Sequence, residues 1–252
     1  MLSKNQIKLI ASLRLKKFRK TENLFVVEGA KIVYELLASD WNIKVIYGTE
    51  EFFQTFKNSK LTGDVELVRV TEDELQKISS LTTPQQTLAI AEIPLPKPNI
   101  NFDSGLFLLL DGINDPGNLG TIIRIADWFG ISEIICSENT VDCYNSKVVQ
   151  ASMGSLFRIN VSYNDLTSLL KDNAMNKKLP VYGTVLNGKN IFDEKLSDSG
   201  FILIGNESTG IDPKNLECIS HPITIPSFNG SNADSLNAAV AAGIVCAEFR
   251  RR

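Results

Sequence analysis

The stretch LFLLLDGINDPGNLGTIIRIADWF, residues 106–129, decides the fold class. Its unbroken apolar run, Leu106 to Leu110, predicts a strand that is buried on both faces. The Asp-Pro-Gly sequence at 115–117 predicts a turn, and Asn118 is expected to cap a helix that runs to about Phe129. The helix presents an apolar face made by Leu119, Ile122, Ile123 and Ala126. A buried strand, a polar loop and an amphipathic helix together form the repeating unit of an open parallel sheet.

The same alternation continues to the end of the chain. Further strands are expected at 133–136, 157–161, 181–185, 201–205 and 223–225, with helical segments between them. This pattern predicts an α/β fold with a parallel sheet and helices on both faces. Ligands in such sheets bind beyond the carboxyl ends of the strands, so the informative loops follow Leu110, Ile204 and Ile225.

The first half of the chain has its own pattern. Pro94, Pro96 and Pro98 predict an extended linker, and 252 residues are enough for two domains. We therefore expect a small α/β domain at 1–93, a linker at 94–104 and a larger domain at 105–252. In the small domain we expect helices at about 4–18, 31–38 and 72–79, and strands at about 24–27, 44–47, 66–70 and 87–92.

Composition excludes several classes of protein. With 43% hydrophobic and 22% charged residues, the chain is that of a globular protein, and no apolar run approaches the roughly 18 residues of a membrane span. The first residues lack the apolar core of a signal peptide, which favours the cytoplasm. The cysteines form no CxxC pair, and Cys218 and His221 lack further metal ligands nearby, so we expect neither disulfides nor a metal.

The net charge of −3 conceals two basic ends. No acidic residue occurs between Met1 and Lys20, and the chain closes on Arg250, Arg251 and Arg252. Such clusters can neutralise RNA phosphates, although a solvated helix face fits a charge run equally well. The basic residues of the first cluster are Lys4, Lys8, Arg14, Lys16, Lys17, Arg19 and Lys20.

Three loops carry candidate functional groups. In the first, Arg124 is expected to reach a phosphate from its helix. The second has the spacing G-x-E-x-x-G, with Gly205, Glu207 and Gly210, before a short helix at 212–218. This spacing is neither that of a dinucleotide fingerprint nor that of a P-loop.

The third loop is the polar stretch 226–234. The helix that follows is expected to start near Ser235, with Asp234 or Asn232 as its cap, and to end near Phe249. Its alanines and Gly243 should let it pack closely against another backbone. Ser235 and Asn237 precede the buried part of this helix and are further candidates for a functional role.

The three loops, in this order and spacing, resemble the SpoU or TrmH-like branch of the SPOUT RNA methyltransferases over residues 105–249. The stretch Phe25-Val26-Val27-Glu28-Gly29 is similar to the ribosomal-protein-like substrate-binding domain of many members. The resemblance implies a deep trefoil knot in the C-terminal domain, which sequence physics alone would not propose.

The resemblance also implies a function, namely methylation of a ribose 2′-hydroxyl in RNA with S-adenosylmethionine as the methyl donor. It implies that cofactor-binding positions fall on Gly205, Ile225, Leu236, Thr184 and Asn206. It further implies that catalytic and RNA-facing positions fall on Arg124, Asn118, Glu207, Ser235 and Asn237. A homodimer is expected, with no metal requirement, and the need for a 2′-hydroxyl excludes DNA as the acceptor.

Two departures and three alternatives accompany this interpretation. Gln150 stands where many relatives have arginine, and the loop from Ser227 to Asp234 is longer than usual, with Ser227 in place of a common methionine. The basic N-terminal domain favours ribosomal RNA, while transfer RNA is the alternative substrate. A non-catalytic RNA-binding member of the fold and a nucleotide-dependent oxidoreductase are the alternatives from other functional classes.

Overall fold

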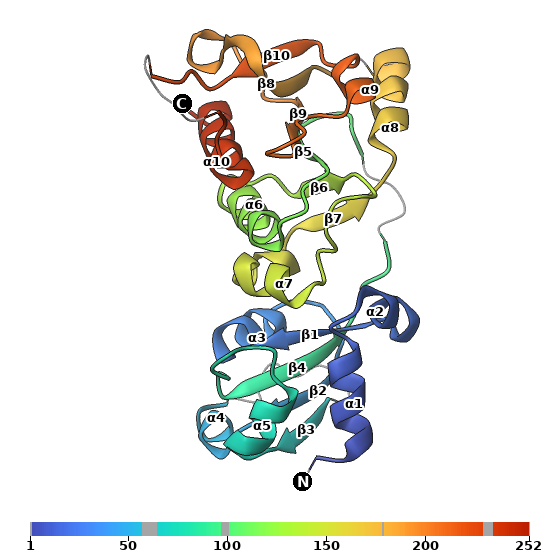
Figure 1. The fold of residues 1–252 in the computed structure, drawn as a ribbon, viewed down its shortest axis with the longest axis vertical. Coiled ribbons are helices and arrows are strands. Elements are labelled where there is room, and N and C mark those ends of the chain that lie inside the picture. The colour runs from blue at the N-terminus through green and yellow to red at the C-terminus, as the bar shows by residue number, and fades with distance from the viewer. Residues whose placement is uncertain (1, 57–64, 97–100, 178, 229–233, 252) are drawn as a thin grey trace. The chain divides into compact units, whose positions relative to one another are not determined.

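The computed structural model describes residues 2–56, 65–96, 101–177, 179–228 and 234–251. The chain forms two compact units, and each is described by itself (Figure 1). The first contains Met1–Leu95 together with Asp142–Phe157, and the second contains Pro96–Val141 and Arg158–Arg252. The inclusion of 142–157 in the first unit is a feature that the linear division at the prolines did not foresee.

The second unit is built on a six-stranded sheet in the order β10-β8-β9-β5-β6-β7. All of its strand pairs are parallel, which confirms the predicted class. The central strand β5 is buried along its whole length, as its apolar run predicted. The strands are β5 (Leu106–Asp111), β6 (Glu133–Cys136), β7 (Asn160–Tyr163), β8 (Val181–Asn190), β9 (Gly200–Gly205) and β10 (His221–Thr224).

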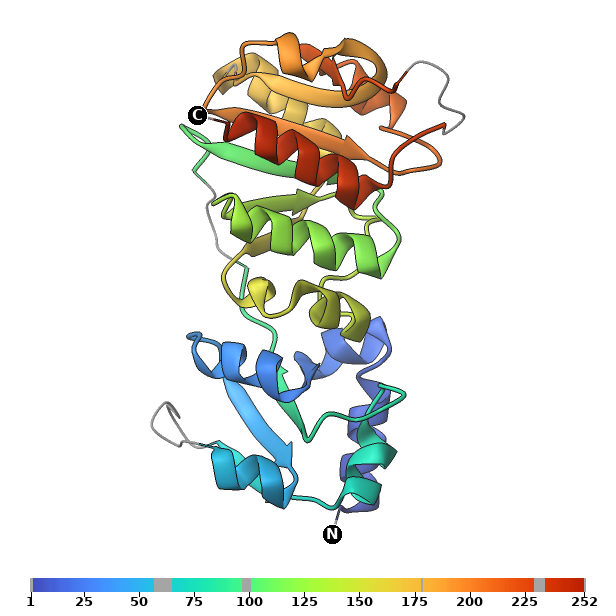
Figure 2. The ribbon, with the colours of Figure 1, turned by 90° about the vertical axis from the view of Figure 1, so that its left-hand side faces the viewer.

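Helices cover both faces of this sheet (Figures 1 and 2). α6 (Pro116–Trp128) and α10 (Ala238–Phe249) lie side by side on one face, with α8 (Leu166–Asp172) and the short α9 (Pro213–Leu216) on the other. The expected strand at 157–161 begins only at Asn160, because 155–157 form a 3-10 turn with buried side chains. Two short helical segments complete the unit, at Asn173–Lys177 and Ile191–Asp193.

Gly243 does not serve the close backbone packing that the sequence suggested. A Cβ atom at Gly243 would lie 3.6 Å from the Cδ1 atom of Ile125 on α6, which is an ordinary van der Waals contact. Because α10 meets a side chain there, and not a backbone, the site has room for a methyl group.

We therefore expect Gly243→Ala to raise the free energy of unfolding by about 0.5–1 kcal/mol, since glycine is a poor helix former. Denaturant titration of the two proteins measures this difference. Gly188→Ala is the contrasting variant, because its Cβ would lie 2.4 Å from the backbone carbon of Ile223 and should destabilise the protein. A loss of stability in Gly243→Ala would contradict the packing described for α10.

The first unit holds a four-stranded mixed sheet in the order β1-β4-β2-β3, with β4 antiparallel to both of its neighbours. The strands are β1 (Leu24–Glu28), β2 (Ile43–Gly48), β3 (Glu66–Arg69) and β4 (Thr87–Glu92). The helices are α1 (Lys4–Ser12), α2 (Lys16–Glu22), α3 (Ala30–Leu37), α4 (Glu50–Thr55), α5 (Glu72–Ile78) and α7 (Ser146–Ser152). One apolar core joins α1 and α5 to the sheet.

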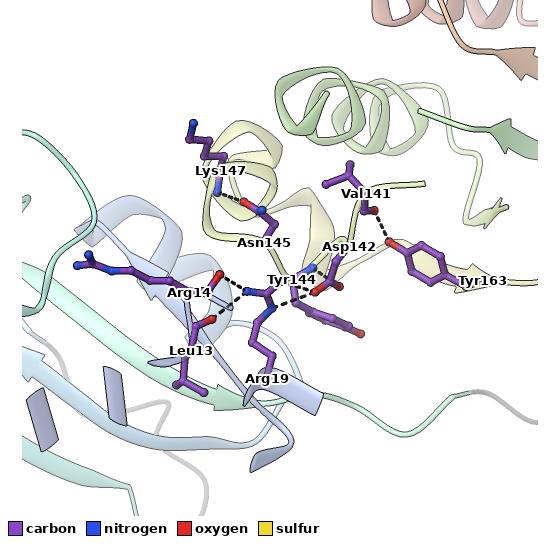
Figure 3. Close-up of polar contacts among 9 residues, drawn as sticks. All are labelled: Leu13, Arg14, Arg19, Val141, Asp142, Tyr144, Asn145, Lys147 and Tyr163. Carbon is purple, nitrogen blue, oxygen red and sulfur yellow. Dashed lines mark hydrogen bonds and ion pairs between the residues drawn. The ribbon is translucent and has the colours of Figure 1, made fainter. Parts of the chain in front are cut away.

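The single helix expected at 4–18 is wrong, since the chain breaks between α1 and α2. Leu15 adopts an extended conformation, while Leu13 is buried in the core. The carbonyl oxygens of Leu13 and Arg14 each accept a hydrogen bond of 2.9 Å from Nη1 of Arg19 (Figure 3). This side chain takes the place of the backbone donors that a continuous helix would supply, so the break is stabilised.

Arg19 is therefore not the phosphate ligand that the basic cluster suggested. Its side chain is only 3% exposed, and its Nη2 and Nε atoms lie 2.5 and 2.9 Å from Oδ2 of Asp142, which is itself 12% exposed (Figure 3). Every nitrogen of the guanidinium thus has a partner within the first unit, and the residue acts as a buried anchor.

The C-terminal basic cluster is also partly engaged within the fold. Arg250 donates from Nε to the carbonyl of Phe129 at 2.9 Å and from Nη2 to that of Gly130 at 3.3 Å. These contacts satisfy carbonyl groups at the C-terminal end of α6, where a positive charge is favoured. Arg251 pairs with Glu248, and Arg252 lies outside the described residues.

All four cysteines are free thiols, and all but the partly exposed Cys218 are buried. Burial raises the pKa of the Cys246 thiol to about 12. Among the described residues no three potential metal ligands come together. In the same part of the chain, no helix is long and apolar enough to cross a membrane.

Candidate active site

A cavity of about 480 Å³ lies against three neighbouring parallel strands of the second unit, in the order β10-β8-β9. It is lined by the middle of β8, by the ends of β9 and β10 with the loops that follow them, by the end of α9 and by the start of α10. The lining residues fall at 184–187, 204–211, 216, 223–225, 235, 236, 238 and 241. This position, beyond the carboxyl ends of parallel strands, is where ligands bind in open α/β sheets.

The loop after β9 forms a closed turn beside the cavity. Backbone hydrogen bonds of 3.0 and 2.9 Å join Asn206 and Gly210 in both directions. Gly205 makes this turn possible, because a Cβ at that position would lie only 2.4 Å from the carbonyl carbon of Gly210. Gly205 is thus required by a close backbone approach and Gly210 by its positive φ of 71°, and the turn between them forms part of the cavity wall.

The side chain of Asn206 holds this turn in place. Its Nδ2 donates to the carbonyl of Gly112 at 2.8 Å, and its Oδ1 accepts from the backbone N–H groups of Ser208 and Thr209. Both ends of the amide are therefore already engaged within the protein. Asn206 lines the cavity, but its side chain serves chiefly to position the loops after β5 and β9.

A buried aspartate that sequence reasoning missed supports the same turn. Asp111, at the end of β5, accepts hydrogen bonds at Oδ2 from the N–H of Asp212 at 2.8 Å and from Nδ2 of Asn215 at 2.9 Å. Asn215 is itself buried and accepts from the hydroxyl of Thr167. The available signal was an acidic residue closing a fully apolar strand, since a buried carboxylate needs such partners.

Three of the predicted catalytic residues form a hydrogen-bonded chain. Oδ1 of Asn237 accepts from the backbone N–H groups of Ala239 and Val240, so its amide must donate from Nδ2. It donates to Oδ1 of Asn118 at 2.8 Å, and Nδ2 of Asn118 donates in turn to Oε1 of Glu207. The direction of the whole chain is set by the capping of α10.

The two predicted helix caps at these loops are wrong. The N-cap of α6 is Asp115, which accepts from the N–H of Asn118, so Asn118 lies inside the first turn. The N-cap of α10 is Asn237, and the helix begins at Ala238, later than expected. Asp234 does not cap it, and Asn232 lies outside the described residues. The corrected caps leave the amide of Asn118 free to join β9 to α10.

The remaining predicted residues divide into two groups. Thr184, Ile225, Ser235 and Leu236 line the cavity together with Gly205, Asn206 and Glu207. Asn118 and Asn237 are not among the described residues that line the cavity. They are connected to it by the hydrogen-bonded chain that ends on Glu207.

Arg124 stands apart from the other candidates. It lies on the exposed face of α6, outside the lining of the cavity in the described part of the chain. Its guanidinium also forms no hydrogen bond or ion pair with any described residue. The structure thus leaves this cation open to a partner outside the fold.

Comparison with known proteins assigns the family. The model described as the SpoU rRNA Methylase family matches residues 105–247, which is more than half of the chain. The chain belongs to the SpoU rRNA methylase family. The region before the linker matches a second model, the MRM3-like substrate binding domain, over residues 4–89.

Similarity to individual SpoU methylases extends over the whole chain. This chain is 34% identical to the 23S rRNA (guanosine(2553)-2'-O)-methyltransferase RlmP of Bacillus subtilis, and the match covers 98% of this chain and 97% of that protein. A putative RNA methyltransferase of the TrmH family from Porphyromonas gingivalis has a similar structure, with a TM-score of 0.89, 37% identity and coverage of 99% and 98%.

A third relative bears on the cofactor. The AdoMet-bound rRNA methyltransferase of Sinorhizobium meliloti matches with a TM-score of 0.84 and 30% identity, covering 99% of this chain and 95% of that one. The cavity here fits such a molecule. Its volume lies within the roughly 300–1,000 Å³ of small-molecule sites. Ile204, Ile211 and Ile223 offer an apolar wall for a purine ring, and the backbone of the 205–210 turn offers polar groups.

Proposed function

We propose that the protein transfers the methyl group of S-adenosylmethionine to a ribose 2′-hydroxyl of ribosomal RNA. The observation that carries this proposal is the cavity at the strand ends, bounded by the Glu207 carboxylate that the Asn237–Asn118 chain holds in place. When bound, the cofactor supplies an electrophilic methyl group. Gly205, Ile225, Leu236 and Thr184 would hold it, with Asn206 keeping the wall of the site in shape.

Alignment of the ribose oxygen is the main task left to the protein, because methyl transfer is an in-line displacement. Oε1 of Glu207 is taken by Asn118, whereas Oε2 has no hydrogen-bond donor among the described residues. We assign this second oxygen to a hydroxyl of the substrate. Ser235, exposed at the rim of the cavity, supplies a further polar group for the same alignment.

Arg124 is assigned to the RNA and not to the cofactor. An arginine has a pKa of about 12.5 or more and is a poor base near neutrality. Its role is therefore to hold a phosphate next to the target nucleotide and to polarise the 2′-oxygen. The exposed, unpartnered position of the side chain in the described structure supports this role.

Ribosomal RNA is favoured over transfer RNA by the first unit. The match to a substrate binding domain over residues 4–89 and the similarity to a 23S rRNA methyltransferase over the whole chain both support this substrate. The test is incubation of the purified protein with labelled cofactor and separate pools of unmodified ribosomal and transfer RNA. Label in the ribosomal pool supports the proposal. Label only in transfer RNA would overturn the proposal that ribosomal RNA is the substrate. Cofactor binding without methyl transfer to either pool would favour the non-catalytic alternative.

We further propose a homodimer formed through the second unit. Two apolar side chains of the neighbouring helices α6 and α10 are exposed, namely Trp128 of α6, 84% exposed, and Val240 of α10, 51% exposed. Tryptophan is enriched at protein–protein interfaces, so Trp128 is the first candidate for a subunit contact. Light scattering of the wild type and of a Trp128→Arg variant tests this, and a monomeric wild type would contradict it.

Two further expectations from the family remain proposals. The strand order is consistent with a SPOUT domain, and we infer from the resemblance to that family that the chain is knotted there. Since the proposed substrate is ribosomal RNA, we also place the protein in the cytoplasm, where bacterial ribosomes are assembled.

A further inference from the structure

Helix α2 presents a concentrated positive charge that the proposed active site does not use. Lys16, Lys17 and Lys20 are all exposed and occupy three of its seven positions. At about 100° per residue they fall within one arc of roughly 100° on the helix surface. We call these three lysines the α2 basic face. The only acidic residue of the helix is Glu22, at its end.

This arrangement is unfavourable for the helix itself. Like charges three and four residues apart repel one another, and an isolated helix of seven residues is marginal in water. No side chain caps its N-terminus. The helix does have a left-handed C-cap at Asn23 and basic residues in its last turn, so its local weakness lies at the N-terminus.

Arg19 supplies further stability from outside this arc, since it lies about 60° beyond Lys16 on the helix surface. Its guanidinium is buried against Asp142 and the carbonyls of Leu13 and Arg14, as Figure 3 shows. Arg19 thus anchors α2 to the rest of the first unit, while the lysines of the helix are exposed to solvent. A rigidly anchored helix with a repulsive outer face indicates a surface kept for an anionic partner.

Lys17 and Lys20 are available to such a partner. The ammonium groups of Lys17 and Lys20 form no ion pair or hydrogen bond with any residue that the structure describes. Two apolar side chains flank them, with Leu15 59% exposed and Phe18 38% exposed. Cations beside an exposed aromatic ring suit a nucleic-acid strand, whose phosphates and bases can each find a contact.

We propose that the α2 basic face docks the phosphate backbone of the RNA substrate and thereby supplies affinity to the first unit. This rests on the proposed function, because it assumes that RNA is the substrate. The face contributes to binding and not to methyl transfer itself, so its loss should raise the KM for RNA and leave kcat unchanged.

The test compares the full-length protein with the triple variant Lys16→Gln, Lys17→Gln and Lys20→Gln. RNA binding is measured by filter retention at several salt concentrations, with a ribosomal RNA transcript as the probe. The slope of log K against log salt should become shallower by about two to three, and affinity at moderate salt should fall by about ten- to a hundred-fold. A matched control, K44Q/K77Q/K171Q, removes three exposed lysines from other elements. Its affinity for RNA should fall much less than that of the triple variant.

Two further readouts separate the possible failures. The thermal midpoint of the triple variant should equal or exceed that of the wild type, since repulsion is relieved. An affinity and slope no different from those of the control variant would overturn the docking surface, even if the wild type methylates RNA normally. The binding assay needs no turnover, so an inactive wild type would count against the proposed function alone.

Discussion

Replacing Arg124 by alanine should lower the rate of methyl transfer at least about a hundred-fold while leaving cofactor binding unchanged. A fall in rate of this size is typical when an enzyme loses one charged group that acts on the reacting oxygen. Cofactor binding should survive because Arg124 does not line the described cavity. Single-turnover kinetics with a ribosomal RNA transcript, together with calorimetric titration of the cofactor, measures both quantities.

Arg158→Ala is the matched control for this loss. Arg158 also belongs to the second unit, but its guanidinium pairs with Asp127 on α6, with an Nη2 to Oδ2 distance of 2.8 Å. Removing it should change the rate no more than about two-fold, since exposed pairs contribute little. Arg124→Lys should fall between the two, because lysine keeps the charge but loses the planar fork. A near-normal rate in Arg124→Ala would remove Arg124 from the mechanism.

Replacing Arg19 by alanine should lower the free energy of unfolding by about 3–5 kcal/mol. The substitution leaves the largely buried carboxylate of Asp142 without its cation, and breaking one side of such an ion pair has an effect of this size. The carbonyls of Leu13 and Arg14 also lose their donor. Chemical denaturation followed by circular dichroism measures the change.

The exposed pair of the same unit provides the comparison. Lys44 lies 2.6 Å from Glu92, but their side chains are 56% and 31% exposed, so Lys44→Ala should shift stability by less than about 1 kcal/mol. The double variant Arg19→Met with Asp142→Leu should regain much of the loss, because no unpaired charge remains buried. Equal losses for Arg19→Ala and Lys44→Ala would show that Arg19 is not an anchor.

The sheet of the second unit could be predicted because three of its strands, β5, β6 and β9, are built on uninterrupted apolar runs. Leu106 to Leu110 is buried as a whole, and the spacing of the apolar runs fixed where most other strands lie. The loops that follow β5, β9 and β10 could be singled out for the same reason, since parallel strands bring their ends to one edge.

Errors arose where contacts distant in sequence decide the local structure. The N-cap of α10 could not be predicted because the sequence offers several residues of the right type, namely Asn232, Asp234, Ser235 and Asn237. The residue that caps the helix, Asn237, also forms a hydrogen bond with Asn118, which is 119 residues away. The break between α1 and α2 depends on Arg19, whose partner Asp142 is 123 residues away. Asp111 was missed because its partners lie more than a hundred residues further along the chain.

The central claim is that the methyl group goes to a ribose oxygen of ribosomal RNA. The most direct measurement is mass spectrometry of nucleosides from an unmodified 23S ribosomal RNA transcript treated with the protein and isotopically labelled S-adenosylmethionine. The account predicts label in one 2′-O-methylated nucleoside, with the methyl group retained on the ribose when the base is released. Label on a base, or no label from a protein that binds the cofactor, would contradict it.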